Sequence, residues 1–178
     1  MLKLYQLAWT NSTTIHNDLL IAKEQVYDKC GFECSLPQKE KESAEYTACS
    51  FNLNGQSVLF RTAKTTPTKT GQFVTLWKRI GKGPIQPFDD ADPIDFVIIN
   101  TRKGDSLGQF IFPKTVLCEH GIFSTSKKEG KRAIRVYPPW DLATNKQAQK
   151  TQKWQLDYFL EIPSDSAIDI ERAKLLLS

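Results

Sequence analysis

Residues 44–64, AEYTACSFNLNGQSVLFRTAK, carry the strongest folding signal in the chain. Two runs of alternating apolar and polar residues flank Asn54-Gly55, the dipeptide most typical of a two-residue β-hairpin loop. A loop of this length fixes the register, so Phe51 is expected to face Val58. One face of the hairpin is then apolar and is predicted to pack against a core: Cys49, Phe51, Leu53, Val58 and Phe60.

The same register, extended to the open end of the hairpin, predicts that Glu45 faces Lys64. A third strand is expected over residues 72–80, after the longer loop TTPTKTG. This loop does not fix the register, and a slip of one residue would exchange the two faces of the strand. We expect Val74 and Leu76 to join the apolar face. The opposite face would carry Tyr46, Ala48, Leu59, Arg61, Ala63, Phe73, Thr75, Trp77 and Arg79.

The rest of the chain alternates between short helices and strands. Periodic apolar residues and turn signals predict helices over residues 13–30, 113–120, 144–155 and 168–176. Apolar runs bounded by turn residues predict strands over residues 93–100, 108–112 and 133–140. The sequence therefore predicts one α+β domain over residues 1–178, with a central mixed or antiparallel sheet flanked by helices.

The composition is that of an ordinary globular domain with a small basic excess. The 178 residues are 40% hydrophobic and 25% charged, and the formal net charge is +4. A charge this small does not establish a polyanionic partner, so its distribution along the chain matters more. No apolar run approaches the roughly 20 residues of a membrane span. The first residues, MLKLYQLAWTNS, lack the basic segment and cleavage site of a secretion signal, and we expect a cytoplasmic protein.

Basic residues gather in three segments. Residues 61–82 contain six basic residues and no acidic one, with Phe73 and Trp77 among them. Residues 127–135 contain five basic residues against one glutamate, and the helix expected over 144–155 carries a stripe of Lys146, Lys150 and Lys153. Basic groups interleaved with aromatic ones are typical of surfaces that bind a phosphate backbone and stack on bases. For each segment taken alone, a solvated amphipathic surface is the alternative.

One candidate catalytic group combines acidic and basic residues. A nuclease uses two or three carboxylates to hold a divalent metal ion, often with a lysine beside them. Glu45 and Lys64 would form part of such a site if Asp95, near the start of the strand 93–100, lay next to them. A simple cross-strand ion pair, with Asp95 in a turn, is the alternative that we favour. The four cysteines fit no standard zinc spacing, so we expect reduced thiols and no metal site.

Residues 60–79, FRTAKTTPTKTGQFVTLWKR, and residues 122–141, IFSTSKKEGKRAIRVYPPWD, are long and unusual motifs. Together with QKTQKWQLDYF, residues 149–159, they resemble the MepB family over about residues 19–159. That family takes its name from a bacterial gene cluster with a multidrug efflux pump. The resemblance implies a bacterial protein with a fold similar to type II restriction endonucleases, and it implies nucleic-acid binding.

In that nuclease fold, a carboxylate on the second strand and a (D/E)xK tripeptide on the third strand hold the metal. The matching tripeptide here is Leu76-Trp77-Lys78, in which leucine replaces the acid. The second strand offers Arg61 and Lys64 but no carboxylate. Only the lysine at position 78 carries over, so the resemblance favours binding without cleavage.

We therefore expect binding of nucleic acid, and DNA in particular, through backbone phosphates with little sequence preference. The first alternative is a Mg²⁺-dependent nuclease that uses Glu45 and Asp95 with Lys64 or Lys78. The second is a non-enzymatic module that binds an acidic protein. We expect no cofactor, except for Mg²⁺ if the protein is a nuclease. The residues expected to contact nucleic acid are Arg61, Lys64, Lys69, Trp77, Lys78, Arg79, Arg132, Lys146, Lys150 and Lys153, with Phe73 or Tyr46 as further stacking groups.

Overall fold

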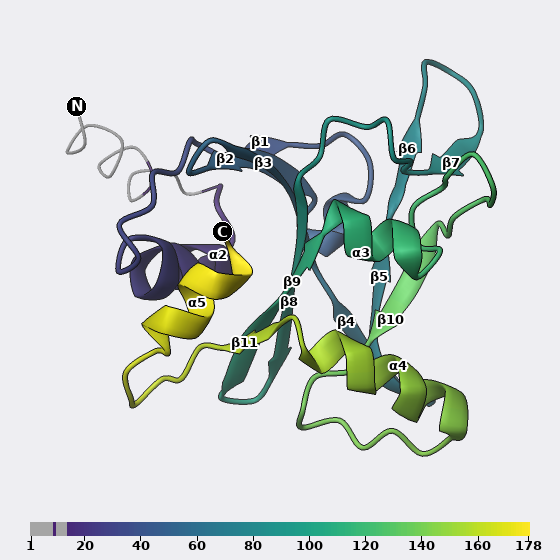
Figure 1. Cartoon of the computed structure of the whole chain (residues 1–178). Coiled ribbons are helices and arrows are strands. Elements are labelled where there is room, and N and C mark those ends of the chain that lie inside the picture. The colour runs from purple at the N-terminus through teal and green to yellow at the C-terminus, as the bar shows by residue number, and fades with distance from the viewer. Residues whose placement is uncertain (1–8, 10–13) are drawn as a thin grey trace.

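A six-stranded sheet forms the centre of the computed structural model, which describes Trp9 and residues 14–178 (Figure 1). Its strand order is β1-β2-β3-β8-β9-β11. β3 pairs with β8 in parallel, whereas the other neighbours pair antiparallel, so the sheet is mixed, as expected for an α+β fold. The strands are β1 (Gln38–Lys39), β2 (Cys49–Leu53), β3 (Gln56–Thr62), β8 (Phe96–Lys103), β9 (Ser106–Pro113) and β11 (Phe159–Glu161).

The β2–β3 hairpin has the predicted register. Phe51 pairs with Val58, and the turn lies at Asn54 and Gly55. These two turn residues have φ angles of 50° and 86°. Positive φ at both central positions is what a type I′ hairpin turn requires, and asparagine and glycine tolerate it best.

The open end of the hairpin differs from the prediction that Glu45 faces Lys64. β2 begins only at Cys49, and Glu45 lies before it in η2 (Ala44–Tyr46), a short 3₁₀ helix. Ser43 and Thr47 flank η2 in the left-handed conformation, each with a φ of 56°. This backbone turns the chain out of the sheet, so the expected cross-strand pair is wrong.

The predicted third strand belongs to a second, smaller sheet. β4 (Lys64–Thr66) and β5 (Lys69–Thr75) form a hairpin, in which Lys64 pairs with Phe73. β10 (Ala133–Val136) pairs with the other edge of β5. The chain also forms a two-stranded ribbon of β6 (Trp77–Arg79) and β7 (Ile85–Pro87). The expectation that this strand extends the hairpin as its third strand is therefore wrong, because the neighbour of β3 in the main sheet is the distant strand β8.

The main sheet separates two apolar cores. The first core, under α2 (Asn17–Ala22), the π-helical turn η1 (Lys23–Tyr27) and α5 (Ile170–Leu176), contains the whole predicted apolar face of the hairpin. The second core lies under α3 (Lys114–Glu119), α4 (Lys146–Leu156) and the small sheet. Val74 and Leu76 are buried as expected, but they lie in the second core and not in the first.

The remaining elements agree with the sequence in type and approximate extent. The helix expected over 13–30 spans Asn17–Tyr27, and residue 13 lies outside the described residues. The three later helices form as α3, α4 and α5, and the three later strands form as β8, β9 and β10. Among the described residues, no helix has the length and apolar character that crossing a membrane requires. Most of the segment that was compared with secretion signals also lies outside the described residues.

Candidate nucleic-acid interface

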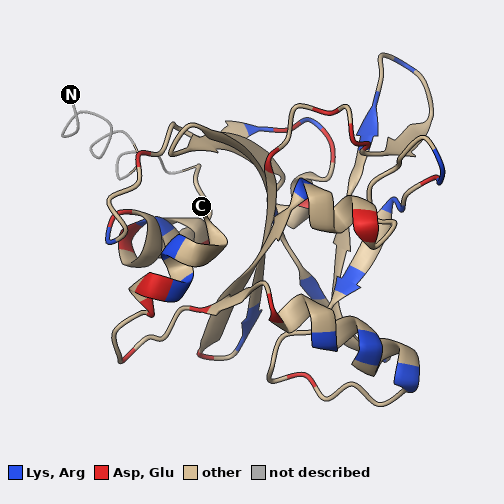
Figure 2. Ribbon diagram, in the orientation of Figure 1, with Lys and Arg blue, Asp and Glu red and all other residues tan. Residues whose placement is uncertain are grey.

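A cleft of about 810 Å³ lies between α4 and the small sheet, on the side of the second core. Four of its lining residues are basic, and together they come from all three basic segments of the sequence: Lys69, Lys131, Arg135 and Lys150. No aspartate or glutamate is among the described residues that line it. We call this feature the basic cleft. Figure 2 shows the lysines along α4 and the basic residues of the neighbouring strands.

The wall formed by α4 is attached to β10 through glutamine side chains. Gln155 is almost completely buried, and its amide accepts a hydrogen bond from the Tyr137 backbone N–H and donates one to the Arg135 carbonyl. Both bonds have ordinary N···O distances, 2.9 Å and 3.0 Å. Gln152 donates to the Asp141 carbonyl at 2.8 Å. These amides supplement the few apolar contacts of α4 and fix its position beside the strand.

Three lysines of the basic cleft are available for a ligand. Lys69, Lys131 and Lys150 are exposed, and none of them forms an ion pair with any described residue. Arg135 differs, because its guanidinium donates hydrogen bonds within the small sheet, to the Thr66 hydroxyl at 2.8 Å and the Gly71 carbonyl at 3.1 Å. The arginine therefore contributes a fixed positive charge to the wall.

Three other predicted contacts flank the basic cleft. Lys146 and Lys153 are exposed on α4, next to Lys150 on one side of the helix. Arg132 precedes β10, donates to the Ile85 carbonyl and pairs with Glu129 at 2.8 Å. The two lysines extend the positive surface along α4, whereas the charge of Arg132 is partly neutralised.

The aromatic pair at the basic cleft was not foreseen in the sequence. His120 and Trp154 both line it, and their rings are stacked, with centroids 3.8 Å apart and planes 9° apart. His120 follows α3, and Trp154 lies on α4. No local pattern in the sequence links two residues so far apart in the chain.

Of the three aromatic residues that were expected to stack on bases, Phe73 lines the basic cleft, whereas Tyr46 and Trp77 lie against cations of the protein itself. The Lys64 ammonium lies 5.0 Å from the ring centroid of Tyr46, and the guanidinium of Arg79 lies 5.6 Å from that of Trp77. Neither Tyr46 nor Trp77 lines the basic cleft. Their predicted role is therefore without support from the geometry of this site.

Arg61 requires a correction. Its side chain is fully buried, and it forms a two-pronged hydrogen-bonded ion pair with Glu40, both bonds measuring 2.8 Å. A third bond runs from the guanidinium to the Phe60 carbonyl. An arginine without an exposed atom cannot reach a phosphate at the surface, so Arg61 is not a phosphate contact.

Lys78 is also engaged within the protein. Its ammonium contacts the carboxylates of Asp89 and Asp92, each at 2.7 Å. Burial lowers the pKa of Lys78, but the hydrogen bonds to both aspartates outweigh it and hold the pKa above its usual value. The same bond to the ammonium lowers the pKa of Asp89. Two carboxylates beside one lysine leave no net positive charge for a phosphate. The ion pairs of Lys78 instead connect β6 to the loop after β7.

The candidate nuclease residues do not converge. Asp95 lies beside the beginning of β3, where its carboxylate accepts a hydrogen bond from the Ser57 backbone N–H at 2.8 Å. Glu45 and Lys64 lie near the opposite end of β3, a strand of seven residues that spans roughly 23 Å. The described residues also contain no cluster of three or more histidine, cysteine, aspartate or glutamate side chains that could hold a metal ion. The geometry thus does not support this metal site.

The four cysteines are free thiols distributed over both faces of the main sheet. Cys49 belongs to the first core, Cys30 and Cys34 pack against it, and Cys118 packs against the second core. Burial raises the pKa of Cys34 and of Cys49 to about 12. These two thiols therefore stay protonated and poorly nucleophilic near neutral pH.

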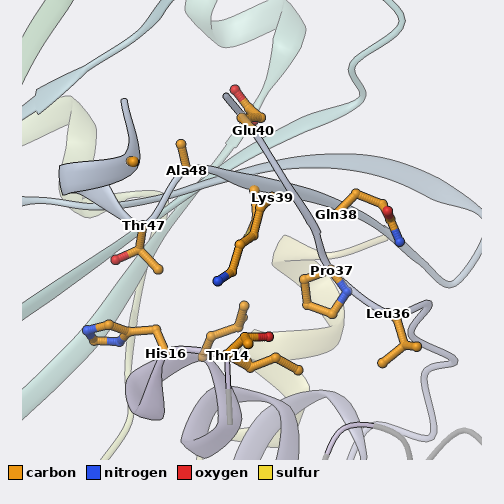
Figure 3. Close-up of a pocket in the computed structure, with 13 residues that line it drawn as sticks. Thr14, His16, Leu36, Pro37, Gln38, Lys39, Glu40, Thr47 and Ala48 are labelled. Atoms are coloured by element: carbon orange, nitrogen blue, oxygen red, sulfur yellow. The ribbon is translucent and has the colours of Figure 1, made fainter. Parts of the chain in front are cut away.

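A second cavity, of about 590 Å³, lies between the beginning of α2 and strands β1 and β2 (Figure 3). Lys39 points into it towards His16, whereas Glu40 points away, consistent with its pairing to Arg61. The cavity begins at Thr14, beside residues outside the described part of the chain. Its described lining residues include one lysine and also the carboxylate residue Glu40, so it has less positive charge than the basic cleft has.

Comparison with known proteins agrees with the resemblance found in the sequence. The MepB-like family model matches residues 40–161, a range that includes all the lining residues of the basic cleft. A crystal structure of MepB is 33% identical to this chain, with a TM-score of 0.72, and the match covers 85% of this chain and 99% of that one. A bacterial homing endonuclease, I-Ssp6803I, matches at 15% identity with a TM-score of 0.46, over 82% of this chain and 93% of that one. No curated protein matches the sequence.

Proposed function

We propose that this chain, which belongs to the MepB-like family, binds the phosphate backbone of a nucleic acid in the basic cleft. One observation carries the proposal. Three separate basic segments supply exposed lysines to the same concave surface, and no carboxylate of a described residue lines it. Solvated charges that serve only solubility would be expected to alternate with acidic groups.

The chemistry of the basic cleft suits a polyanion. Lysine ammonium groups act as mobile point charges, and they contact phosphates without demanding one orientation. Each lysine that neutralises a phosphate releases condensed counterions, which supplies affinity independent of sequence. The described residues include no helix or ribbon that the geometry assigns to reading base edges, so we expect little sequence preference.

The surface beside the basic cleft extends the contact. Lys146 and Lys153 lie along α4 on either side of Lys150, which gives a basic track about two helical turns long. The Lys64 ammonium remains exposed above Tyr46 but does not line the basic cleft. A backbone that crosses the basic cleft would therefore meet further positive charge along α4.

Salt-dependent binding tests this proposal. Labelled DNA, both as a duplex and as a single strand, is titrated with the protein at about 50 mM and 200 mM salt, with fluorescence anisotropy as the readout. We expect the affinity to fall steeply with salt. The triple variant Lys69→Ala, Lys131→Ala, Lys150→Ala should bind more weakly to every sequence. Its salt slope should fall by about one unit for each phosphate that is no longer neutralised.

Lys174→Ala is the matched control, because Lys174 is exposed on α5, on the opposite side of the main sheet. It removes the same kind of charge but should leave the salt slope unchanged. No binding, binding indifferent to salt, or a triple variant that binds like the wild type would contradict the proposal. Absence of binding would redirect attention to an acidic protein partner.

A further inference from the structure

We infer that the basic cleft takes a single-stranded segment, one base of which stacks on His120. This inference rests on the proposed function and specifies its substrate class. The observation behind it is the stacked pair of His120 and Trp154, which places an aromatic platform among the free lysines.

The second core holds this aromatic platform in place through Trp154. Trp154 is half-buried, and its ring contacts Phe112 of the second core at a centroid distance of 5.4 Å. The imidazole of His120 lies parallel to the indole, so one of its faces is covered. His120 is nevertheless exposed and lines the basic cleft. A planar ligand group can therefore add to the stack on the uncovered face of a histidine that is already held in position.

Only an unpaired base can use such a platform. In a duplex, each base is stacked between its neighbours, and its faces are inaccessible. In a single strand, base faces are free, and stacking on an aromatic side chain tolerates any sequence. The volume of about 810 Å³ also lies within the range of pockets that enclose small ligands. A volume of this size is compatible with a short stretch of single strand.

The charges are placed for the phosphates on either side of the stacked base. Lys131, which precedes β10, and Lys150, on α4, line the same cavity as His120 and are both free of ion pairs with described residues. Single-strand binders generally combine a positive groove for the backbone with aromatic groups for the bases. The basic cleft has both parts.

An abasic oligonucleotide separates stacking from charge. Wild-type protein is titrated with a thymidine dodecamer, with a dodecamer of abasic sites and with a duplex of the same length. We expect the thymidine strand to bind at least about fivefold more tightly than the abasic strand, since stacking on an aromatic side chain strengthens binding by about that factor or more per base. A uridine dodecamer compares RNA with DNA, and a preference for either supports the inference, because both expose unpaired bases.

Three variants make the test specific. In His120→Ala, the affinity for the thymidine strand should fall to that for the abasic strand. His120→Phe should restore the tighter binding of the thymidine strand, because a phenyl ring can stack in the same place. Thr115→Ala, at an exposed position of α3, is the control and should behave as the wild type.

The outcomes distinguish this inference from the proposed function. Equal binding of thymidine and abasic strands, or an unaltered His120→Ala variant, would overturn the inference while salt-dependent binding still stood. Absence of binding to every oligonucleotide would overturn both.

Discussion

Arg61 lies in the most basic segment of the chain, yet its side chain has no exposed surface. Strand alternation placed it correctly on the face of β3 that it shares with Leu59 and Ala63. What the sequence did not reveal is that this face is covered by the second core, most of whose residues come from later in the chain. A buried guanidinium is tolerated here because the carboxylate of Glu40 is hydrogen-bonded to it at both oxygens.

Removal of the carboxylate should therefore be costly. Glu40→Ala leaves the buried charge of Arg61 without its partner, and we expect a loss on the order of 3 kcal/mol in the free energy of unfolding. Urea denaturation followed by circular dichroism measures it. Binding of the folded variant to nucleic acid should not change, because neither residue lines the basic cleft.

Glu45→Ala is the control for this pair, because Glu45 is exposed and forms no ion pair with a described residue. Its effect should stay within about 0.5 kcal/mol. If Glu40→Ala proved equally harmless, the ion pair would be of no consequence for stability.

At the scale of elements, local signals determined what could be predicted. The Asn54-Gly55 turn fixed the β2–β3 register, and the apolar run before residue 100 gave β8. The third strand was misplaced because the longer TTPTKTG loop does not impose a register or a sheet. Parallel pairing of β3 with β8 joins residues 38 positions apart, as in Val58 with Phe96, and no local pattern specifies such a contact.

The attachment of α4 was also invisible in the sequence, because it depends on a polar residue. Gln155→Leu would leave a backbone N–H of Tyr137 and a carbonyl of Arg135 buried without partners. We expect a loss on the order of 3 kcal/mol in stability. Hydrogen exchange should become faster in α4, and affinity for nucleic acid should fall because Lys150 is no longer held at the basic cleft.

Gln147→Ala tests the same helix at an exposed position that lines the cleft. Its exchange rates should match those of the wild type. Unchanged exchange in Gln155→Leu would show that the apolar contacts of Trp154 and Leu156 suffice to hold α4 in place.

At the scale of the whole molecule, the net charge of +4 concealed a strongly uneven distribution. Several basic residues of the sequence are neutralised internally, as Arg61 and Lys78 are, whereas free lysines meet at one cleft. The basic composition of the three segments could be recognised in the sequence. Their convergence follows from β10 pairing with β5 and from α4 packing on β10, which are contacts between distant parts of the chain.

The main sheet is shared by both cores, which should make the described fold unfold as one unit. Successive residues of β8 point to opposite faces, so Ile98 is fully buried in the first core and Ile99 in the second. Ile98→Ala and Ile99→Ala should each lower the free energy of unfolding by about 2–5 kcal/mol.

Each of these two variants should accelerate global hydrogen exchange equally in α5 and in β10, although these elements lie on opposite sides of the sheet. Ile80→Ala, at an isoleucine that is 68% exposed, is the matched control with little expected effect. Faster exchange confined to the mutated side would show that the two cores open independently, and the basic cleft could then loosen without unfolding of the first core.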